Sequence, residues 1–236
     1  MTAIERPFAA RIAIILNNAA KKAALAVRQN GRDVVLDSVL SDLNDDLLAV
    51  YVPAYTRISK IFGDRLLNAF KSHADYETKA DDLFADSMEL WIRATAAERV
   101  VMVSNTTKRM IREVIDDGFA DELTGAQVAK NIVDKTGGVI ARNRAVTISR
   151  TETHMAAQHA SLEAAKSTGI PMRRVWIAAA DERTRENHTA EDSNSHAEPV
   201  GMNEPFRVTG LMYPGDPGGD PAETIQCRCA VGYVTD

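Results

Sequence analysis

Apolar residues recur at helical spacing through the first part of the chain. From residue 8 to residue 28 they fall every three or four positions, and an Asn-Gly pair that tolerates left-handed backbone follows at 30–31, so a first helix is predicted here. A second stripe runs from Leu36 to Val50, and helical spacing resumes from Ile58 to Phe70. Pro53 lies between them and predicts a kink or a break, because proline lacks an amide donor and clashes with the preceding turn.

The longest helical segment runs from about Ala80 to Asp117, where Gly118 is expected to end it. Its length of about 38 residues far exceeds the mean helix, so we expect either an extended helical arm or one break near Ser104. A short helix follows and closes at Gly137-Gly138. The apolar stripe of the long segment can be buried on other helices or on a partner, and consists of Leu83, Leu90, Ala94, Ala97 and Val101, flanked by Phe84, Met88 and Trp91.

A further helix is predicted from about residue 139 to residue 168. Glu152 and His159 fall on its apolar stripe, in a series of positions that alternates steps of four and three. A charged side chain on a stripe that faces a core needs a partner. Arg183 and Arg185 are the nearest candidates in the motif that follows, so we expect Glu152 to be buried and paired with one of them.

The hydrophobic period then changes from that of a helix to that of a strand. Residues 174–179 alternate with a period of two, and a second strand is expected around residues 229–234, after Gly and Pro clusters at 214–221. The fold class is therefore α+β: a long, mainly helical N-terminal region followed by a small α+β domain. We place the boundary at Gly137-Gly138, which gives a helical docking or assembly region at 1–137 and an α+β domain at 138–236.

Composition is that of an ordinary soluble globular protein, with 45% hydrophobic and 26% charged residues. The net charge of −5 is uneven: from Thr151 onward there are 7 Lys and Arg against 13 Asp and Glu, which leaves the first 150 residues at +1. Contact with DNA would therefore need local cationic patches on the helical part. Candidates are Lys108, Arg109, Arg112, Arg142, Arg144 and Arg150, although most such runs are solvated helix surface.

Neither a signal peptide nor a membrane span is expected, because the apolar run at 12–16 is too short for either. Two cysteines one residue apart do not form the disulfide framework of a secreted protein. We therefore place the chain in a reducing cytoplasm while it is being made.

Cys227 and Cys229 are two positions apart on a predicted strand, so both side chains should leave the same face. A disulfide between them would be strained, whereas a metal is easier to chelate, and Cys with His is a ligand set for zinc. His188 is the best third ligand, with His196 or Asp181 as the fourth. The alternative is that both cysteines are small buried apolar residues and that the chain has no cofactor.

The segment from Asp181 to His188 has three interpretations. Asp181 can cap a helix, with Thr184 at the third position. Arg183 or Arg185 can form a bidentate pair with Glu152. In the third interpretation Asp181 and His188 form an acid–base pair, or His188 holds a metal that activates water. Phosphate-binding and zinc-protease motifs and the Gly-x-Ser-x-Gly signature of serine hydrolases do not occur, so we expect no catalytic residue and no enzyme.

Taken in order, these motifs resemble the C-terminal domain of the phage Mu F-like minor head proteins, from about residue 148 to residue 234. The motif residues are Arg150, Glu152, Trp176, Asp181, Arg183, Arg185 and His188, followed by Pro205-Phe206, Pro214-Gly215-Asp216-Pro217 and Cys227-Arg228-Cys229. Where the family usually has an Asp-Gly pair after its His, this chain has residues 192–195, and Asn194 is the expected turn residue.

The resemblance implies a virion protein, a minor capsid protein of head morphogenesis that assists procapsid assembly. Its expected partners are the portal protein and the major capsid or scaffolding proteins, with packaged DNA contacted in some family members and no membrane. Its expected location is the head interior or the portal, after assembly in the host cytoplasm. The alternative is a small metal-dependent hydrolase, or a nuclease of the toxin type, centred on His188.

Overall fold

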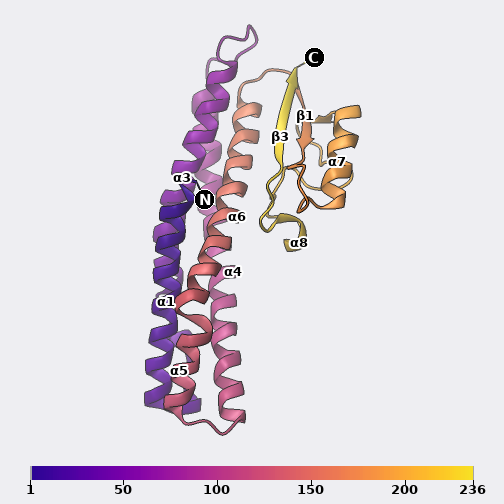
Figure 1. Ribbon diagram of the computed structural model, residues 1–236. Helices are drawn as coiled ribbons and strands as arrows, with labels where there is room; N and C mark the ends of the chain where they lie inside the picture. The colour runs from indigo at the N-terminus through magenta and orange to yellow at the C-terminus, as the bar shows by residue number, and fades with distance from the viewer. Residues whose placement is uncertain (1, 236) are drawn as a thin grey trace. The chain divides into compact units, whose positions relative to one another are not determined.

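The structure is a computed structural model and describes residues 2–235. Helices make up 68% of the chain, and one three-stranded antiparallel sheet lies near the C-terminus (Figure 1). This confirms the predicted α+β class, with a helical N-terminal region and a small α+β part after it. Within the described part of the chain, each helix is too short or too polar to cross a bilayer.

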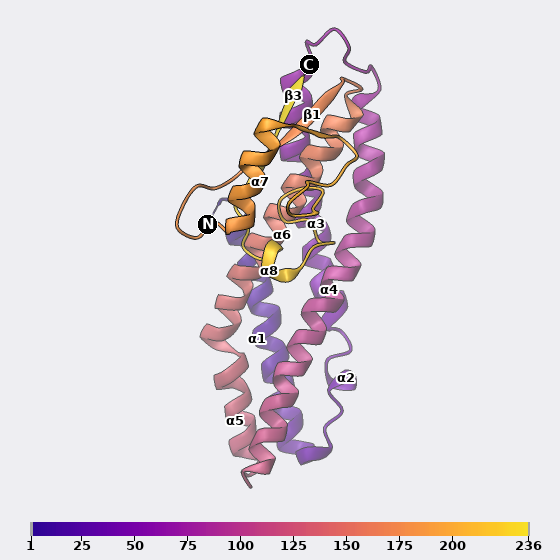
Figure 2. The same cartoon turned by 90° about the vertical axis from the view of Figure 1, so that its right-hand side faces the viewer.

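The elements follow one another along the chain as labelled in Figures 1 and 2. In order they are α1 (Glu5–Asn30), η1 (Gly31–Asp33), α2 (Leu36–Val39), α3 (Leu43–Phe70), α4 (Ala80–Ala120), α5 (Gly125–Thr136), α6 (Gly138–Ser167), β1 (Met172–Ile177), α7 (Glu186–Ala197), β2 (Val200–Gly201), α8 (Pro221–Thr224) and β3 (Ala230–Thr235).

Helix α3 passes through Pro53 without a break. Proline removes the hydrogen bond to the carbonyl four residues earlier, which is that of Ala49, and both Pro53 and Ala49 are exposed, so water can satisfy that oxygen. The predicted stripe from Leu36 to Val50 is instead divided between the short α2 and the start of α3 at Leu43.

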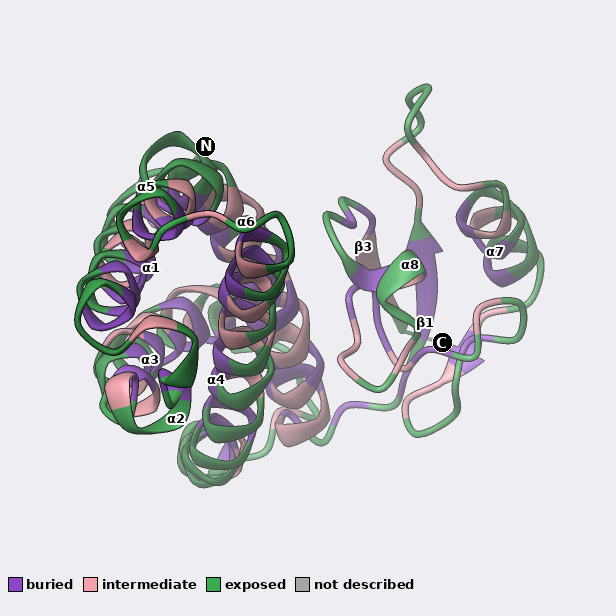
Figure 3. Ribbon diagram, turned by 90° about the horizontal axis from the view of Figure 1, so that it is seen from below, coloured by how far each residue is buried: buried purple, intermediate pink, exposed green. Residues whose placement is uncertain are grey.

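Helix α4 is an unbroken helix of 41 residues, so the extended arm, rather than a break near Ser104, is what the structure shows. It ends two residues beyond Gly118. Its predicted apolar stripe is wrong, because Leu83, Leu90 and Val101 are 51%, 74% and 44% exposed. The buried face of α4 is Ala80, Phe84, Met88, Ile92, Ala96 and Val100. Figure 3 shows how buried and exposed positions are divided around the helices.

The chain packs into two compact units, and each is formed from separate stretches of sequence. Unit 1 comprises Met1–Ala54 and Arg93–Ser149, and unit 2 comprises Tyr55–Ile92 and Arg150–Asp236. The transitions fall inside α3, α4 and α6 rather than in loops. The boundary predicted at Gly137-Gly138 falls at the turn between α5 and α6, and independent folding of its two sides stays a prediction.

Unit 1 is organised by α1. Its apolar face contributes ten buried residues, and α5 packs so closely on it that a Cβ added at Gly125 would lie 3.2 Å from the carbonyl oxygen of Val27. A capping box between Thr124 and Gln127 begins α5. The start of α6 is joined to α1 by the amide of Gly138, which donates to Oδ1 of Asn17 at 3.0 Å.

The helical part of unit 2 is held by a row of aromatic rings. Trp91 stacks on His159 with ring centres 4.2 Å apart, and Tyr55 and Tyr213 lie at the two ends of the row, within 5.5 Å of their neighbours. Burial lowers the pKa of His159 to about 4, so its imidazole is neutral at neutral pH. The row brings α3, α4, α6 and the loop before α8 into one core.

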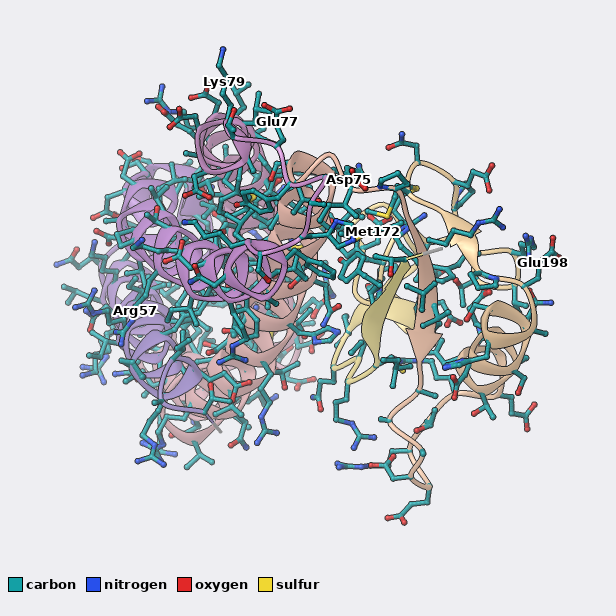
Figure 4. All side chains as sticks on the ribbon, turned by 90° about the horizontal axis from the view of Figure 1, so that it is seen from above. Arg57, Asp75, Glu77, Lys79, Met172 and Glu198 are labelled. Carbon is teal, nitrogen blue, oxygen red and sulfur yellow. The ribbon has the colours of Figure 1, made fainter. Side chains whose placement is uncertain are left out.

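The sheet of unit 2 follows directly from the end of α6. The amide of Glu77, before α4, donates to the carbonyl of Thr168 at 2.8 Å, which fixes the turn into Met172 and β1 (Figure 4 labels Glu77 and Met172). β1 is the central strand and pairs antiparallel with β3 along its whole length, and with β2 at only two positions. In Figures 1 and 3, α7 lies beside β1.

The neutral state of the half-buried His159 predicts that acid destabilises unit 2. Its folded pKa of about 4 lies below the ordinary histidine value of 6.5, so the unfolded chain binds the proton first and stability falls as pH drops from about 6.5 to about 4. The loss can reach about 3 kcal/mol. His159→Phe should lose clearly less over this range, in urea titrations followed by tryptophan fluorescence. Both tryptophans lie in unit 2.

Glu163, Lys166 and Asp216 face this imidazole, and the measurement must separate their titration from that of His159. His73, which is more exposed, is the matched control: His73→Phe should keep the acid sensitivity of the unchanged chain. An identical pH dependence for His159→Phe and the unchanged chain would contradict the prediction.

Candidate functional site

His188, Cys227 and Cys229 meet in the interior of unit 2. The Nδ1 atom of His188 lies 3.4 Å from the sulfur of Cys229 and 3.8 Å from that of Cys227, and all three residues are at most 4% exposed. His188 comes from the first turn of α7, and both cysteines precede β3, which begins at Ala230. They are therefore not on a strand as predicted, although their sulfurs still converge on one ring.

A carboxylate on α8 orients the imidazole. Oε2 of Glu223 lies 2.9 Å from Nε2 of His188 and accepts a hydrogen bond of 2.7 Å from the Asn187 side chain. Because a carboxylate only accepts, Nε2 carries the proton and the Nδ1 lone pair faces the two sulfurs. Asp220 caps α8 and Pro221 follows it, which places Glu223 in the first turn.

The two thiols interact as a pair. Interaction with Cys229 raises the pKa of Cys227, and interaction with Cys227 lowers the pKa of Cys229. Both cysteines are free. A site with one sulfur already stabilised as thiolate is suited to bind a soft cation.

Trp176 covers the imidazole. The centre of its ring lies 4.9 Å from that of His188 and 5.2 Å from that of Phe206, and both pairs of rings are steeply inclined to each other, at 72° and 87°. Its amide donates to Oγ of Ser195 on α7 at 2.8 Å, which joins β1 to that helix. Residues 192–195 lie within α7, so the expectation of a turn at Asn194 is wrong.

Arg174, two positions before Trp176 on the same face of β1, is completely buried. Its Nε and Nη2 donate to the carbonyl oxygen of Gly201 at 3.1 and 2.7 Å, and its guanidinium also donates to the carbonyls of Glu204 and Met212. Burial lowers its pKa, and the group lies 5.1 Å above the ring centre of Phe206. One side chain thus fastens two stretches of irregular backbone to the sheet.

The Asp181 segment is a turn and not the helix cap predicted for it. Oδ1 of Asp181 accepts from the amide of Arg183 at 3.0 Å, whereas α7 begins after Arg185. Asp181 also forms an ion pair with Arg228, the residue between the cysteines, and this pair lowers the pKa of Asp181. Asp181 and His188 therefore have different partners, and the acid–base interpretation is not what the structure shows.

The other residues predicted for the site are either exposed to solvent or paired with groups outside the cluster of His188, Cys227 and Cys229. Arg185 donates to the carbonyl of Ile225 at 2.9 Å, Arg150 and Arg183 are exposed, and His196 pairs with Asp192 within α7. Neither Asp181 nor His196 joins the cluster of three.

Glu152 is 1% exposed and accepts a hydrogen bond from the hydroxyl of Tyr55, on α3. The predicted pairing with Arg183 or Arg185 is wrong, because the hydroxyl comes from a helix that sequence spacing could not place beside α6. One position earlier, Oγ1 of Thr151 accepts from the amide of Gln226 at 3.1 Å, which ties α6 to the segment that holds the cysteines.

Sequence reasoning missed Glu223, Arg174 and Tyr55. The Asp-Pro pair at 220–221 is a signal for a helix start and could have placed Glu223 in a first turn. Arg174 was visible as the one charge on the face of β1 that also carries Trp176. Tyr55 had no local signal, because its partner is 97 positions away.

The hydroxyl of Tyr55 should measurably stabilise unit 2. Tyr55→Phe leaves the buried Glu152 carboxylate short of one donor, which costs about 1–3 kcal/mol. Tyr233→Phe is the matched control, because the hydroxyl of Tyr233 has no hydrogen-bond partner among the described residues, and its effect should stay within about 0.5 kcal/mol. Equal urea midpoints for the two variants would contradict this.

Arg174→Lys should destabilise unit 2 by at least about 2 kcal/mol, because one ammonium cannot reproduce a planar fork that reaches three carbonyls. Arg183→Lys, on an exposed turn of the same unit, should change stability by less than about 0.5 kcal/mol. The measurement is the free energy of unfolding from tryptophan fluorescence in urea. Similar values for the two variants would show that the carbonyls do not need the guanidinium.

Comparison with known proteins gives one finding. The family model described as Phage Mu protein F like protein matches residues 109–232, which is more than half of the chain and includes the cluster of His188, Cys227 and Cys229. Comparison with curated proteins and with solved structures gave no match. The chain belongs to the Phage Mu protein F like family, a family of structural phage head proteins.

Proposed function

We propose that this phage head protein assists procapsid assembly as a minor component, and that unit 1 docks it on the portal at the inside of the head. Family membership supports the head role. The observation that carries the docking step is an open, apolar groove on unit 1 that is about 470 Å³ in volume. Assembly in the host cytoplasm, followed by residence in the virion, is part of the same proposal.

The groove runs between the first half of α1 and the first turns of α6. It is lined by Arg6, Ala9, Ala10, Ala13, Ile14, Asn17, Gly138, Arg142 and Val146. Alanine and glycine let another backbone approach closely, and Ile14 is 61% exposed at its edge. Val139 and Ile140 nearby are 57% and 38% exposed, so apolar surface continues beyond the groove. Contiguous surface of this kind marks a site for a protein partner.

The charges of the groove indicate the kind of segment that fits it. Arg6 and Arg142 are its two cations, and it contains no acidic residue among those that line it. A helix with an apolar face and acidic flanks, supplied by the portal or by another head protein, satisfies both features.

DNA is the less supported partner. Of the cations considered as a DNA-binding face, Lys108 pairs with Asp37 at 2.8 Å and Arg109 pairs with Glu113 at 2.6 Å. Arg112 donates to the carbonyl of Val34, and Arg144 donates to Thr107. These side chains are engaged within unit 1, so they do not form a free cationic stripe.

The alternative of a metal hydrolase centred on His188 is disfavoured by burial. A hydrolase must bring its substrate to the metal, whereas His188 and both cysteines are at most 4% exposed. His188→Ala separates the two functions: an assembly protein that still folds enters particles, and a metal hydrolase loses turnover.

The docking step is tested with the full-length chain. Ile14→Glu places an anion at the edge of the groove and should reduce the number of copies per procapsid about tenfold, which corresponds to about 1.4 kcal/mol of binding. Val35→Glu is the control, because Val35 is also in unit 1, is equally exposed at 62%, and lies outside the groove. Copies are counted by quantitative mass spectrometry of purified particles.

Cross-linking from the groove identifies the partner. A photoreactive residue at Ala10 should capture the portal protein in procapsids and lose it when Ile14→Glu is added. Normal copy number for a folded Ile14→Glu variant would overturn docking through this groove, and capture of the major capsid protein alone would overturn the choice of the portal.

A further inference from the structure

From the geometry of unit 2 we infer that His188, Cys227 and Cys229 bind one zinc ion, which joins α7 to the segment between α8 and β3. The inference is independent of the proposed docking, because the groove of unit 1 contains none of these residues. It rests on three donor atoms that come from two separate elements and meet at one point in the interior.

The spacing of these atoms fits a tetrahedral zinc ion. Zinc binds sulfur at about 2.3 Å and imidazole nitrogen at about 2.0–2.1 Å, which places a sulfur and a nitrogen of one tetrahedron about 3.5 Å apart. The two distances from Nδ1 of His188 to the sulfurs are 3.4 and 3.8 Å, and all donor atoms of the cluster lie within 4.8 Å of one another. The sulfur of Cys227, at 3.8 Å, lies slightly farther from Nδ1 than this geometry requires.

The imidazole is already oriented for a metal. Glu223 holds the proton of His188 on Nε2 at 2.9 Å, so the lone pair of Nδ1 points to the sulfurs. A carboxylate behind a ligating histidine is the usual arrangement at zinc sites, where it fixes the ring and increases its basicity. Asn187 in turn donates to Glu223 at 2.7 Å, and Trp176 packs against the imidazole with ring centres 4.9 Å apart.

Ligand chemistry selects the metal. Two thiolates and one imidazole suit zinc, whereas Mg²⁺ and Ca²⁺ require oxygen ligands. Both cysteines bind as thiolates, so a thiol that is still protonated releases its proton to solvent when the ion binds, and the ion does not change oxidation state. Among the described residues the cluster offers three protein ligands, which leaves the fourth tetrahedral position to a ligand from outside the cluster, such as water.

A metal at this point has a structural consequence. α7 contacts the sheet through Trp176 and Ser195, and the segment with the cysteines contacts α6 through Thr151 and Gln226. The ion adds a bond between these two elements that exists in the folded state only, so it stabilises unit 2 by mass action.

Cobalt substitution tests the site on the full-length protein. The chain is purified under reducing conditions, freed of metal with a chelator, and titrated with Co²⁺, which reports sulfur ligands by a charge-transfer band in the near ultraviolet and tetrahedral geometry by intense visible bands. One Co²⁺ per chain with both signals is expected, and Zn²⁺ should displace it. Because the chain has two cysteines, both in the cluster, the sulfur band reports this site alone.

Variants assign the ligands. Cys227→Ser and Cys229→Ser should each weaken Co²⁺ binding more than a hundredfold and reduce the sulfur band. Glu223→Gln keeps an acceptor beside His188 without the charge and should weaken zinc binding about 10–100-fold. His196→Ala, on the exposed side of the same helix, should bind metal like the unchanged chain.

Two measurements on the unchanged chain keep the test decisive if the cysteine variants do not fold. Zn²⁺ should slow alkylation of both thiols at least tenfold and raise the midpoint of thermal unfolding by several degrees. The inference is overturned if the reduced chain binds no Co²⁺ at micromolar concentration, if bound Co²⁺ lacks the sulfur band, or if protein prepared without oxidant contains a Cys227–Cys229 disulfide and no metal.

Discussion

One buried cation holds the irregular part of unit 2 in place. The guanidinium of Arg174 donates to backbone carbonyls in two different loops, and the cost of removing its charge from water is offset only because these oxygens surround it. Trp176, two positions along the same face, is placed by the same strand and in turn positions His188. The cluster of His188 and the two cysteines therefore depends on a residue that contacts none of its ligands.

Local patterns predicted the elements better than they predicted the faces of those elements. The long helices, β1 and β3 follow from periodicity and from the Gly and Pro positions at their ends. On α4 two sets of apolar residues have helical spacing, one with Phe84 and Met88 and one with Leu90. Tertiary contacts bury the first set, whereas Leu90 is 74% exposed. α7 was anticipated only as a helix that Asp181 could cap, because its twelve residues are almost entirely polar and its buried contacts are made by three side chains, His188, Glu191 and Ser195.

The residues of the site were visible from the sequence as chemical types, but their pairings were not. The sequence indicated that His188 and the cysteines could share a ligand, since few other residues offer sulfur or imidazole. It misplaced the partner of Glu152, because a buried carboxylate requires a donor without specifying which one, and Tyr55 is brought there by packing of α3 on α6. Partners more than a few dozen residues apart are a property of the fold.

The interleaving of the two units sets an order for folding during synthesis. Tyr55 and Trp91 leave the ribosome well before His159 and Glu152, which they cover in the finished protein, so unit 2 cannot close until α6 has emerged. Unit 1 also needs residues up to Ser149, and the cysteines of unit 2 are made after all of these. A nascent chain of this protein therefore carries Tyr55 and Trp91 without their partners on α6 until residues 152–159 have been made.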